Sequence, residues 1–107
     1  MSTILLIIWV HWIADFVAQT NWMAKGKSSS NLTLTAHIVA YSLFLLVFGP
    51  KYAVVNGVLH WITDYFSSRQ TKKLWEKGDV HNFFVVIGLD QAIHLTTLLV
   101  TIPLMGW

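Results

Sequence analysis

Long apolar segments fill most of this 107-residue chain. Four can be drawn, over about residues 3–23, 33–49, 52–68 and 82–104, and each is long enough for an α-helix to cross a bilayer. Charged residues make up only 11% of the chain, against about 25% in a typical soluble domain. A soluble domain of this size could not bury its 55% apolar residues. We therefore expect an all-α fold, a four-transmembrane-helix bundle that forms one integral membrane domain over residues 1–107.

The positions of the basic residues predict how such a bundle is oriented. Six of the seven Lys and Arg residues follow the first or the third segment, namely Lys25, Lys27, Arg69, Lys72, Lys73 and Lys77. Only Lys51 lies at the other end of the segments. Because basic loops stay in the cytoplasm, we expect cytoplasmic charged loops and both termini outside. A net charge of +2 could indicate binding to nucleic acid or to a membrane surface. Because the sequence contains no nucleic-acid-binding motif, we expect membrane lipid to be the partner.

Ionisable residues lie inside the apolar segments, where lipid should exclude them. Three of the five acidic residues are there: Asp15, Asp64 and Asp90. Each Asp at the middle of a membrane helix costs roughly 2.5–3.5 kcal/mol, so residues of this kind are candidates for function. Four histidines share the segments with them: His11, His37, His60 and His94.

The spacing of these residues pairs them. His11 precedes Asp15 by four residues, His60 precedes Asp64 by four, and Asp90 precedes His94 by four. A spacing of four places two side chains on the same face of a helix.

An internal two-helix repeat supports the pairing. Residues 11–16 (HWIADF) resemble residues 60–65 (HWITDY), 49 positions later. The first and third segments cross the membrane in the same direction, so the repeat places both pairs at the same depth, related by a pseudo-two-fold axis along the membrane normal.

All seven ionisable groups would then meet in the cytoplasmic half of the bundle, where facing helices commonly build metal sites. Imidazoles and carboxylates suit one or two divalent ions, with zinc favoured and manganese or iron as alternatives. The predicted ligands are His11, Asp15, His37, His60, Asp64, Asp90 and His94. One of the carboxylates Asp15, Asp64 and Asp90 could instead act as the catalytic base for a metal-bound water. Five polar residues near these stripes could orient the ligands: Gln19, Tyr41, Asn56, Ser67 and Gln91. No cysteine is present to supply a thiolate ligand.

The stretch from His11 to Gln19 and the segment from Asp90 to His94 resemble a family of short phage and bacterial membrane proteins of unknown function, family 3307. The resemblance covers almost the full length and implies a bacterial inner (plasma) membrane. The paired motifs are more distantly similar to membrane-bound metal-dependent hydrolases and to the zinc-dependent phospholipase C-like superfamily. That likeness implies phosphodiesterase chemistry on a zinc cluster. In those enzymes the histidine of each pair comes before the acidic residue, whereas Asp90 comes before His94 in this chain. The chain is also much shorter than those soluble enzymes.

Three functions fit these residues. The first is a membrane-embedded, metal-dependent hydrolase, a phosphoesterase that acts on a lipid or head-group phosphate. The second is a small metal or proton transporter, in which the same ligands would line a path through the bilayer. The third is a phage holin-like or exclusion membrane protein in which a metal only holds the fold. Four helices are close to the minimum that encloses a site, so a homodimer is also possible.

Overall fold

The computed structural model describes residues 2–107, and this part of the chain is helical without a strand. The all-α fold expected from the sequence is therefore confirmed. The five α-helices are α1 (Thr3–Trp12), α2 (Asn21–Gly26), α3 (Asn31–Leu45), α4 (Pro50–Glu76) and α5 (Val80–Val100). A π-helix (Ile13–Val17) continues α1, and short 3-10 turns (Leu46–Phe48 and Ile102–Leu104) follow α3 and α5.

Side-chain caps fix where the helices begin. A hydroxyl accepts a hydrogen bond from a backbone N–H of the first turn in three of them, at Ser2 for α1, Thr20 for α2 and Ser30 for α3. The carboxylate of Asp79 caps α5, and the side-chain amide of Asn82 also donates to it. The hydrogen bonds from the side chain and the backbone of Asn82 lower the pKa of Asp79. Helix α4 begins at Pro50. Proline suits this position because the N–H of a first helical residue has no hydrogen-bond partner within the helix, so its absence costs nothing.

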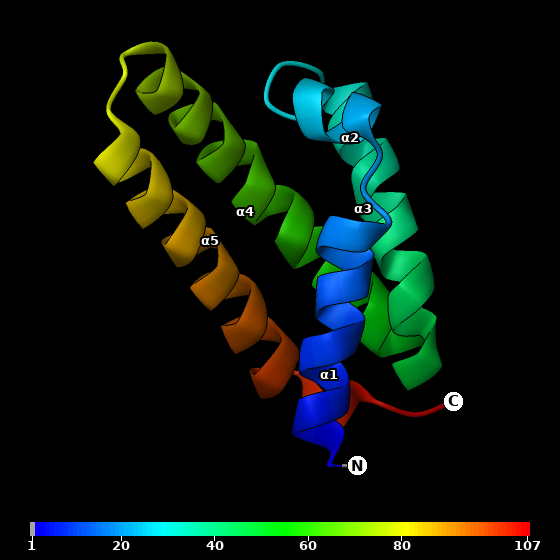
Figure 1. Cartoon of the computed structure of the whole chain (residues 1–107). Helices are drawn as coiled ribbons and strands as arrows, with labels where there is room; N and C mark the ends of the chain where they lie inside the picture. The colour runs from blue at the N-terminus through cyan, green and yellow to red at the C-terminus, as the bar shows by residue number, and fades with distance from the viewer. Residues whose placement is uncertain (1) are drawn as a thin grey trace.

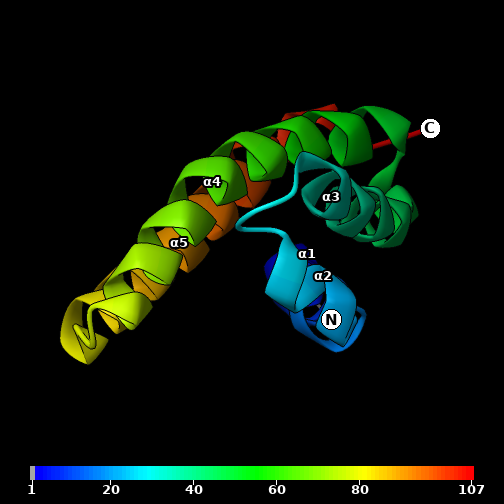
Figure 2. The ribbon, with the colours of Figure 1, turned by 90° about the horizontal axis from the view of Figure 1, so that it is seen from above.

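The helices run up and down along one long axis (Figure 1). Helices α4 and α5 form an antiparallel hairpin, and α3 packs against α4. Seen from above, the α4–α5 hairpin reaches out to one side of the remaining helices (Figure 2). The α4–α5 turn and the α2–α3 connection lie at one end of the molecule, and the chain ends at the opposite end (Figure 1). We call these the loop end and the terminal end.

Two of the expected segments have different bounds in the structure. The first was expected to be one helix over residues 3–23, but the helical path stops at Val17 and resumes in α2 after the cap at Thr20. The third was expected to end near residue 68, but α4 continues to Glu76. The polar residues after Ser68 are good helix formers, and the positive φ of Gly78 comes only after the helix has ended.

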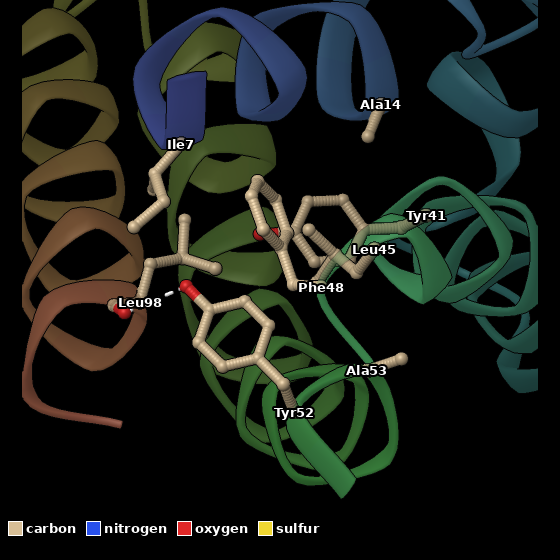
Figure 3. Packing of buried hydrophobic residues seen from close by; sticks show 8 residues of the cluster. All are labelled: Ile7, Ala14, Tyr41, Leu45, Phe48, Tyr52, Ala53 and Leu98. Atoms are coloured by element: carbon tan, nitrogen blue, oxygen red, sulfur yellow. Dashed lines mark hydrogen bonds between the residues drawn. The ribbon is translucent and has the colours of Figure 1, made fainter. Parts of the chain in front are cut away.

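The apolar core occupies the terminal end of the bundle. Ile7, Leu45, Tyr52 and Leu98 are fully buried there, with Phe48 beside them (Figure 3). The phenol of Tyr52 donates a 2.6 Å hydrogen bond to the backbone carbonyl of Leu98 and so joins α4 to α5. One turn nearer the loop end, the buried side chains become polar, with His11 after Ile7 and His94 before Leu98. The apolar core thus forms the floor of a polar centre.

Two helical stretches are long and apolar enough to cross a membrane, Asn31–Phe48 and Val80–Val100. The stretch Thr3–Val17 is apolar but shorter. Helix α4, with 27 residues, is long enough but less apolar than these two stretches.

Candidate metal centre

Four ligand atoms from three helical segments, the π-helix, α3 and α4, form a closed ring of buried side chains. The Nε2 atom of His37 lies 3.1 Å from Oδ1 of Asp15 and 3.4 Å from Oδ2 of Asp64. The Nε2 atom of His60 lies 3.4 Å and 3.0 Å from the same two oxygens. Ligand atoms about 2.0–2.2 Å from a tetrahedral ion lie about 3.3–3.6 Å apart, and those of an octahedral ion slightly closer. The ring therefore has the spacing of atoms that share one metal ion.

Hydrogen bonding alone does not account for this ring. Each Nε2 carries at most one proton, so two imidazoles cannot fill four N···O contacts. Only the contact from His60 to Asp64 has hydrogen-bond geometry. Both ring nitrogens of His37 are buried and find no hydrogen-bond partner among residues 2–107. A buried nitrogen aimed at two carboxylates without a hydrogen bond is typical of a metal ligand.

A second group of ligands adjoins the first through Asp64. The Nε2 atom of His94 lies 3.1 Å from Oδ1 of Asp64 and 3.0 Å from Oδ2 of Asp90. Asp64 therefore belongs to both groups: its Oδ2 faces His37 and His60, and its Oδ1 faces His94. A shared carboxylate of this kind can bridge two ions about 3.5–4 Å apart. The imidazoles of His60 and His94 stack with their centroids 3.7 Å apart.

The charges of the centre also favour a divalent ion. Asp15, Asp64 and Asp90 are buried, and the ammonium of Lys27 lies 3.6 Å from Oδ2 of Asp64. With neutral histidines, three carboxylates and one ammonium leave two negative charges, which one divalent ion would balance. Leaving such charges unbalanced in the interior would be costly.

His11 has a different environment from the other predicted ligands. Gln91 donates from its amide nitrogen to Asp15 (3.3 Å) and to Asp90 (3.1 Å). Because carboxylates only accept, the amide oxygen of Gln91 faces His11 and accepts from its Nε2 at 2.8 Å. Nδ1 of His11 then accepts from the hydroxyl of Tyr41 at 3.2 Å. Both nitrogens of His11 are thereby occupied, and neither ligand group of described residues includes it.

The π-helix explains why the two copies of the repeat differ. In α4, His60 and Asp64 lie in a regular helix and their side chains meet at 3.0 Å. In the first copy, Asp15 lies inside the π-helix, whose wider turn is closed by the bond from Ala18 N–H to the carbonyl of Ile13. His11 and Asp15 are there 3.8 Å apart, and Asp15 meets His37 and His60 instead. π-Helical turns occur frequently at functional sites.

The five expected orienting residues divide into two sets. Tyr41 and Gln91 bond as described, and the hydroxyl of Ser67 donates to Asp90. Asn56 instead donates to the backbone of Tyr52 and to Thr101, and the buried side-chain oxygen of Gln19 has no partner among residues 2–107. Lys27 was expected only to set the orientation, and its contact with Asp64 had no signal in the sequence.

The fold and this centre define a small helical protein with two possible membrane spans and a buried His/Asp cluster that can hold a metal ion. A model of a family described as a protein of unknown function (DUF3307) matches residues 2–107, so the chain belongs to that family. No curated protein and no solved structure matches the chain. The more distant similarity to metal-dependent hydrolases therefore gains no support from relatives.

Proposed function

We propose that this protein is a membrane-embedded, metal-dependent phosphoesterase that acts on a phosphate ester of membrane lipid. The observation that carries the proposal is the sharing of Asp64 between two ligand groups, His37 and His60 on one side and His94 on the other. Two ions bridged by a carboxylate are the arrangement that enzymes use to hold both the attacking and the leaving oxygen of a phosphoester.

The surface of the bundle supports a location in lipid with four membrane crossings. Large apolar side chains are exposed along one face of α4, at Val54, Val58, Ile62 and Phe66. The outer faces of α1, α3 and α5 are apolar as well. Soluble monomers rarely expose apolar patches of this extent. A helix of 27 residues is about 40 Å long, against about 30 Å of hydrocarbon, so the polar end of α4 would extend into water.

The position of the basic residues favours a cytoplasmic loop end. Lys25 and Lys27 line the same cleft as Lys72, so both basic loops lie at one end of the bundle. By the positive-inside rule the ligand groups would then open toward the cytoplasm, in a bacterial inner membrane with both termini outside.

The apolar core supports a hydrolase over a transporter. Between the ligand groups and the terminal end lie Ile7, Leu45 and Leu98, which are fully buried. The polar side chains of this region donate to backbone carbonyls, Asn56 to that of Tyr52 and Tyr52 to that of Leu98. A transported ion would need a continuous row of polar groups along this path.

A bound divalent ion would supply a Lewis acid and lower the pKa of a water molecule. The chain would then orient the substrate through hydrogen bonds. Water adds its oxygen to phosphorus, the P–O ester bond breaks, and the leaving alkoxide takes up a proton. Asp90, which opens to the cleft and accepts from Ser67, is placed to hold the proton removed from water.

The test is the metal content of the detergent-purified protein by elemental analysis, together with phosphate release from lipid substrates. We expect the wild-type protein to bind one or two ions, Asp64→Asn to lose them because both groups share that carboxylate, and hydrolysis to disappear with them. Asp79→Asn is the matched control, since Asp79 lies at the α4–α5 turn and asparagine also caps a helix well. A folded wild-type protein that binds no metal after reconstitution would contradict the proposal.

A further inference from the structure

A cleft of about 670 Å³ is lined by the α4–α5 hairpin on one side and by the end of α2 with the connection to α3 on the other. Its floor includes Asp64 and Asp90, one from each side of the second ligand group. A molecule bound in this cleft would therefore have one end directly beside the candidate metal centre.

Three lysines line one part of the cleft, and three carboxylates, Asp64, Glu76 and Asp90, line it as well, so the positive surplus comes from bound ions. Lys25 lines it from the last turn of α2, Lys27 from the α2–α3 connection, and Lys72 from α4. With two divalent ions in place, these three lysines and the ions outweigh Asp15, Asp64, Asp90 and Glu76 by three positive charges. A group with two negative charges fits this surplus better than a zwitterionic group does.

Another part of the lining is apolar and aromatic. Phe83, Phe84 and Ile87 line it from α5, and Trp75 lines it from the end of α4. The rings of Trp75 and Phe83 contact each other with centroids 5.1 Å apart. Trp75 and Phe84 are nevertheless each 61% exposed, so they present apolar surface to whatever occupies the cleft.

We propose that the cleft binds a lipid with a terminal phosphate group, a phosphomonoester rather than a diester that carries choline or ethanolamine. The dianionic phosphate lies between Lys27, Lys72 and the ions, and the hydrocarbon chain lies along Phe84 and Ile87. This inference rests on the proposed function and deepens it, because it names the substrate class of the same site.

Neither half of the cleft alone would select such a ligand. Free inorganic phosphate would use the lysines but leave Trp75, Phe83 and Phe84 facing water or bulk lipid. An uncharged diacylglycerol would use the aromatic wall but leave the lysines and ions without a counter-charge. The phosphate-bearing lipid is the ligand that satisfies both parts.

The test is a binding measurement that does not depend on turnover. The zinc-loaded protein in detergent is titrated with a short-chain phosphonate analogue of phosphatidate, in which a methylene replaces the ester oxygen. Phosphatidylcholine and diacylglycerol of the same chain length, and inorganic phosphate, are the comparison probes, and native mass spectrometry counts the bound molecules. We expect the phosphonate lipid to bind at least about tenfold more tightly than each of the other three, as charge-assisted hydrogen bonds imply.

Two pairs of variants locate the binding. Lys72→Gln should weaken binding of the phosphonate lipid about tenfold, whereas Lys73→Gln should not, because Lys73 is outside the set of described residues that line the cleft. Phe84→Ser should weaken it as well, and Phe66→Ser, on an exposed face of α4, should not. The zinc content of all four variants should equal that of the wild type.

Equal affinity for the phosphonate lipid and for phosphatidylcholine, or equal effects of Lys72→Gln and Lys73→Gln, would overturn the inference. Inorganic phosphate that binds as tightly as the phosphonate lipid would overturn it too, because the aromatic wall would then contribute nothing. Selective binding without hydrolysis of a cleavable phosphatidate would instead contradict the proposed function. Hydrolysis of a soluble phosphate ester without selective lipid binding would uphold the function and contradict the inference.

Discussion

At the scale of single residues, the centre depends on which atom of each side chain faces inward. Asp15 presents Oδ1 to His37 and His60 while its other oxygen accepts from Gln91. Gln91 donates to Oδ2 of Asp90, the oxygen that also faces His94, and Ser67 donates to Oδ1 of Asp90. Gln91 therefore connects the carboxylates of both ligand groups without being a ligand, and it also fixes the proton on Nε2 of His11. It is a positioning residue.

Gln91→Leu should lower the affinity for metal about 10–100-fold, since partners that orient ligands have effects of this size. Leucine keeps the bulk of the side chain but removes the hydrogen bonds to Asp15, Asp90 and His11. Competition with a chromophoric chelator measures the affinity, and circular dichroism checks that the helices remain. Gln70→Leu, at an exposed position of α4, is the matched control and should leave the affinity unchanged. Equal affinities in the wild type and Gln91→Leu would show that the amide has no positioning role.

At the scale of elements, the turns at the terminal end hold the helices in register. Gly49 links the 3-10 turn after α3 to α4 with a φ of +117°, a conformation that L side chains rarely adopt. A Cβ placed there would collide with the backbone of Gly106. The chain end is held beside it by the hydrogen bond from the N–H of Gly106 to the carbonyl of Phe48. This contact closes the core on the side away from the cleft.

Gly49→Ala should destabilise the protein by about 1–3 kcal/mol, because the new methyl group meets both backbone strain and a steric clash. Thermal unfolding in detergent measures the change. Gly88→Ala is the control, since Gly88 lies within α5 with open space around its Cα, and it should be neutral or stabilising by about 0.5–1 kcal/mol. A smaller loss of stability for Gly49→Ala than for Gly88→Ala would contradict the packing described at the chain end.

At the scale of the whole molecule, the ligand groups join segments that are far apart in the sequence. Asp15 comes from the π-helix after α1, His37 from α3, His60 and Asp64 from α4, and Asp90 and His94 from α5. The apolar core is small and lies at the terminal end, whereas the loop end is opened by the cleft. Metal bound at the centre would therefore hold together the half of the bundle that has the least apolar packing.

Removing metal with a chelator should lower the unfolding temperature of the wild-type protein by about 11–22 °C. An ion at 100 times its dissociation constant stabilises the folded state by about 2.7 kcal/mol, and each kcal/mol corresponds to about 4–8 °C in a chain of this size. The chelator should have no effect on Asp64→Asn, which lacks the shared ligand. A wild-type unfolding temperature that does not respond to chelator or to added zinc would contradict a role for metal in holding the bundle together.

The sequence predicted the residues of the centre better than the path of the backbone. Helical spacing and the position of charges in apolar segments brought out six side chains that the structure places together: Asp15, His37, His60, Asp64, Asp90 and His94. Ionisable side chains are rare in membrane helices and mostly face the interior of a bundle. The π-helix could not be predicted, since nothing in residues 13–17 distinguishes a five-residue turn from a four-residue one. The environment of His11 could not be predicted either, because it depends on Gln91 reaching across from α5.

Because Asp15 lies in a π-helix, deleting one residue after it and deleting one residue before it have different consequences for the centre. Deleting one residue after Asp15, at Phe16 or Val17, would turn the segment into an ordinary α-helix and keep the spacing of four from His11. Deleting one residue before Asp15 would shorten that spacing and rotate the carboxylate by about 100° around the helix axis. Among relatives that differ in length here, a gap on the first side would let Asp15 meet His11 as Asp64 meets His60, and a gap on the second side would turn the carboxylate away from both of its present histidine partners.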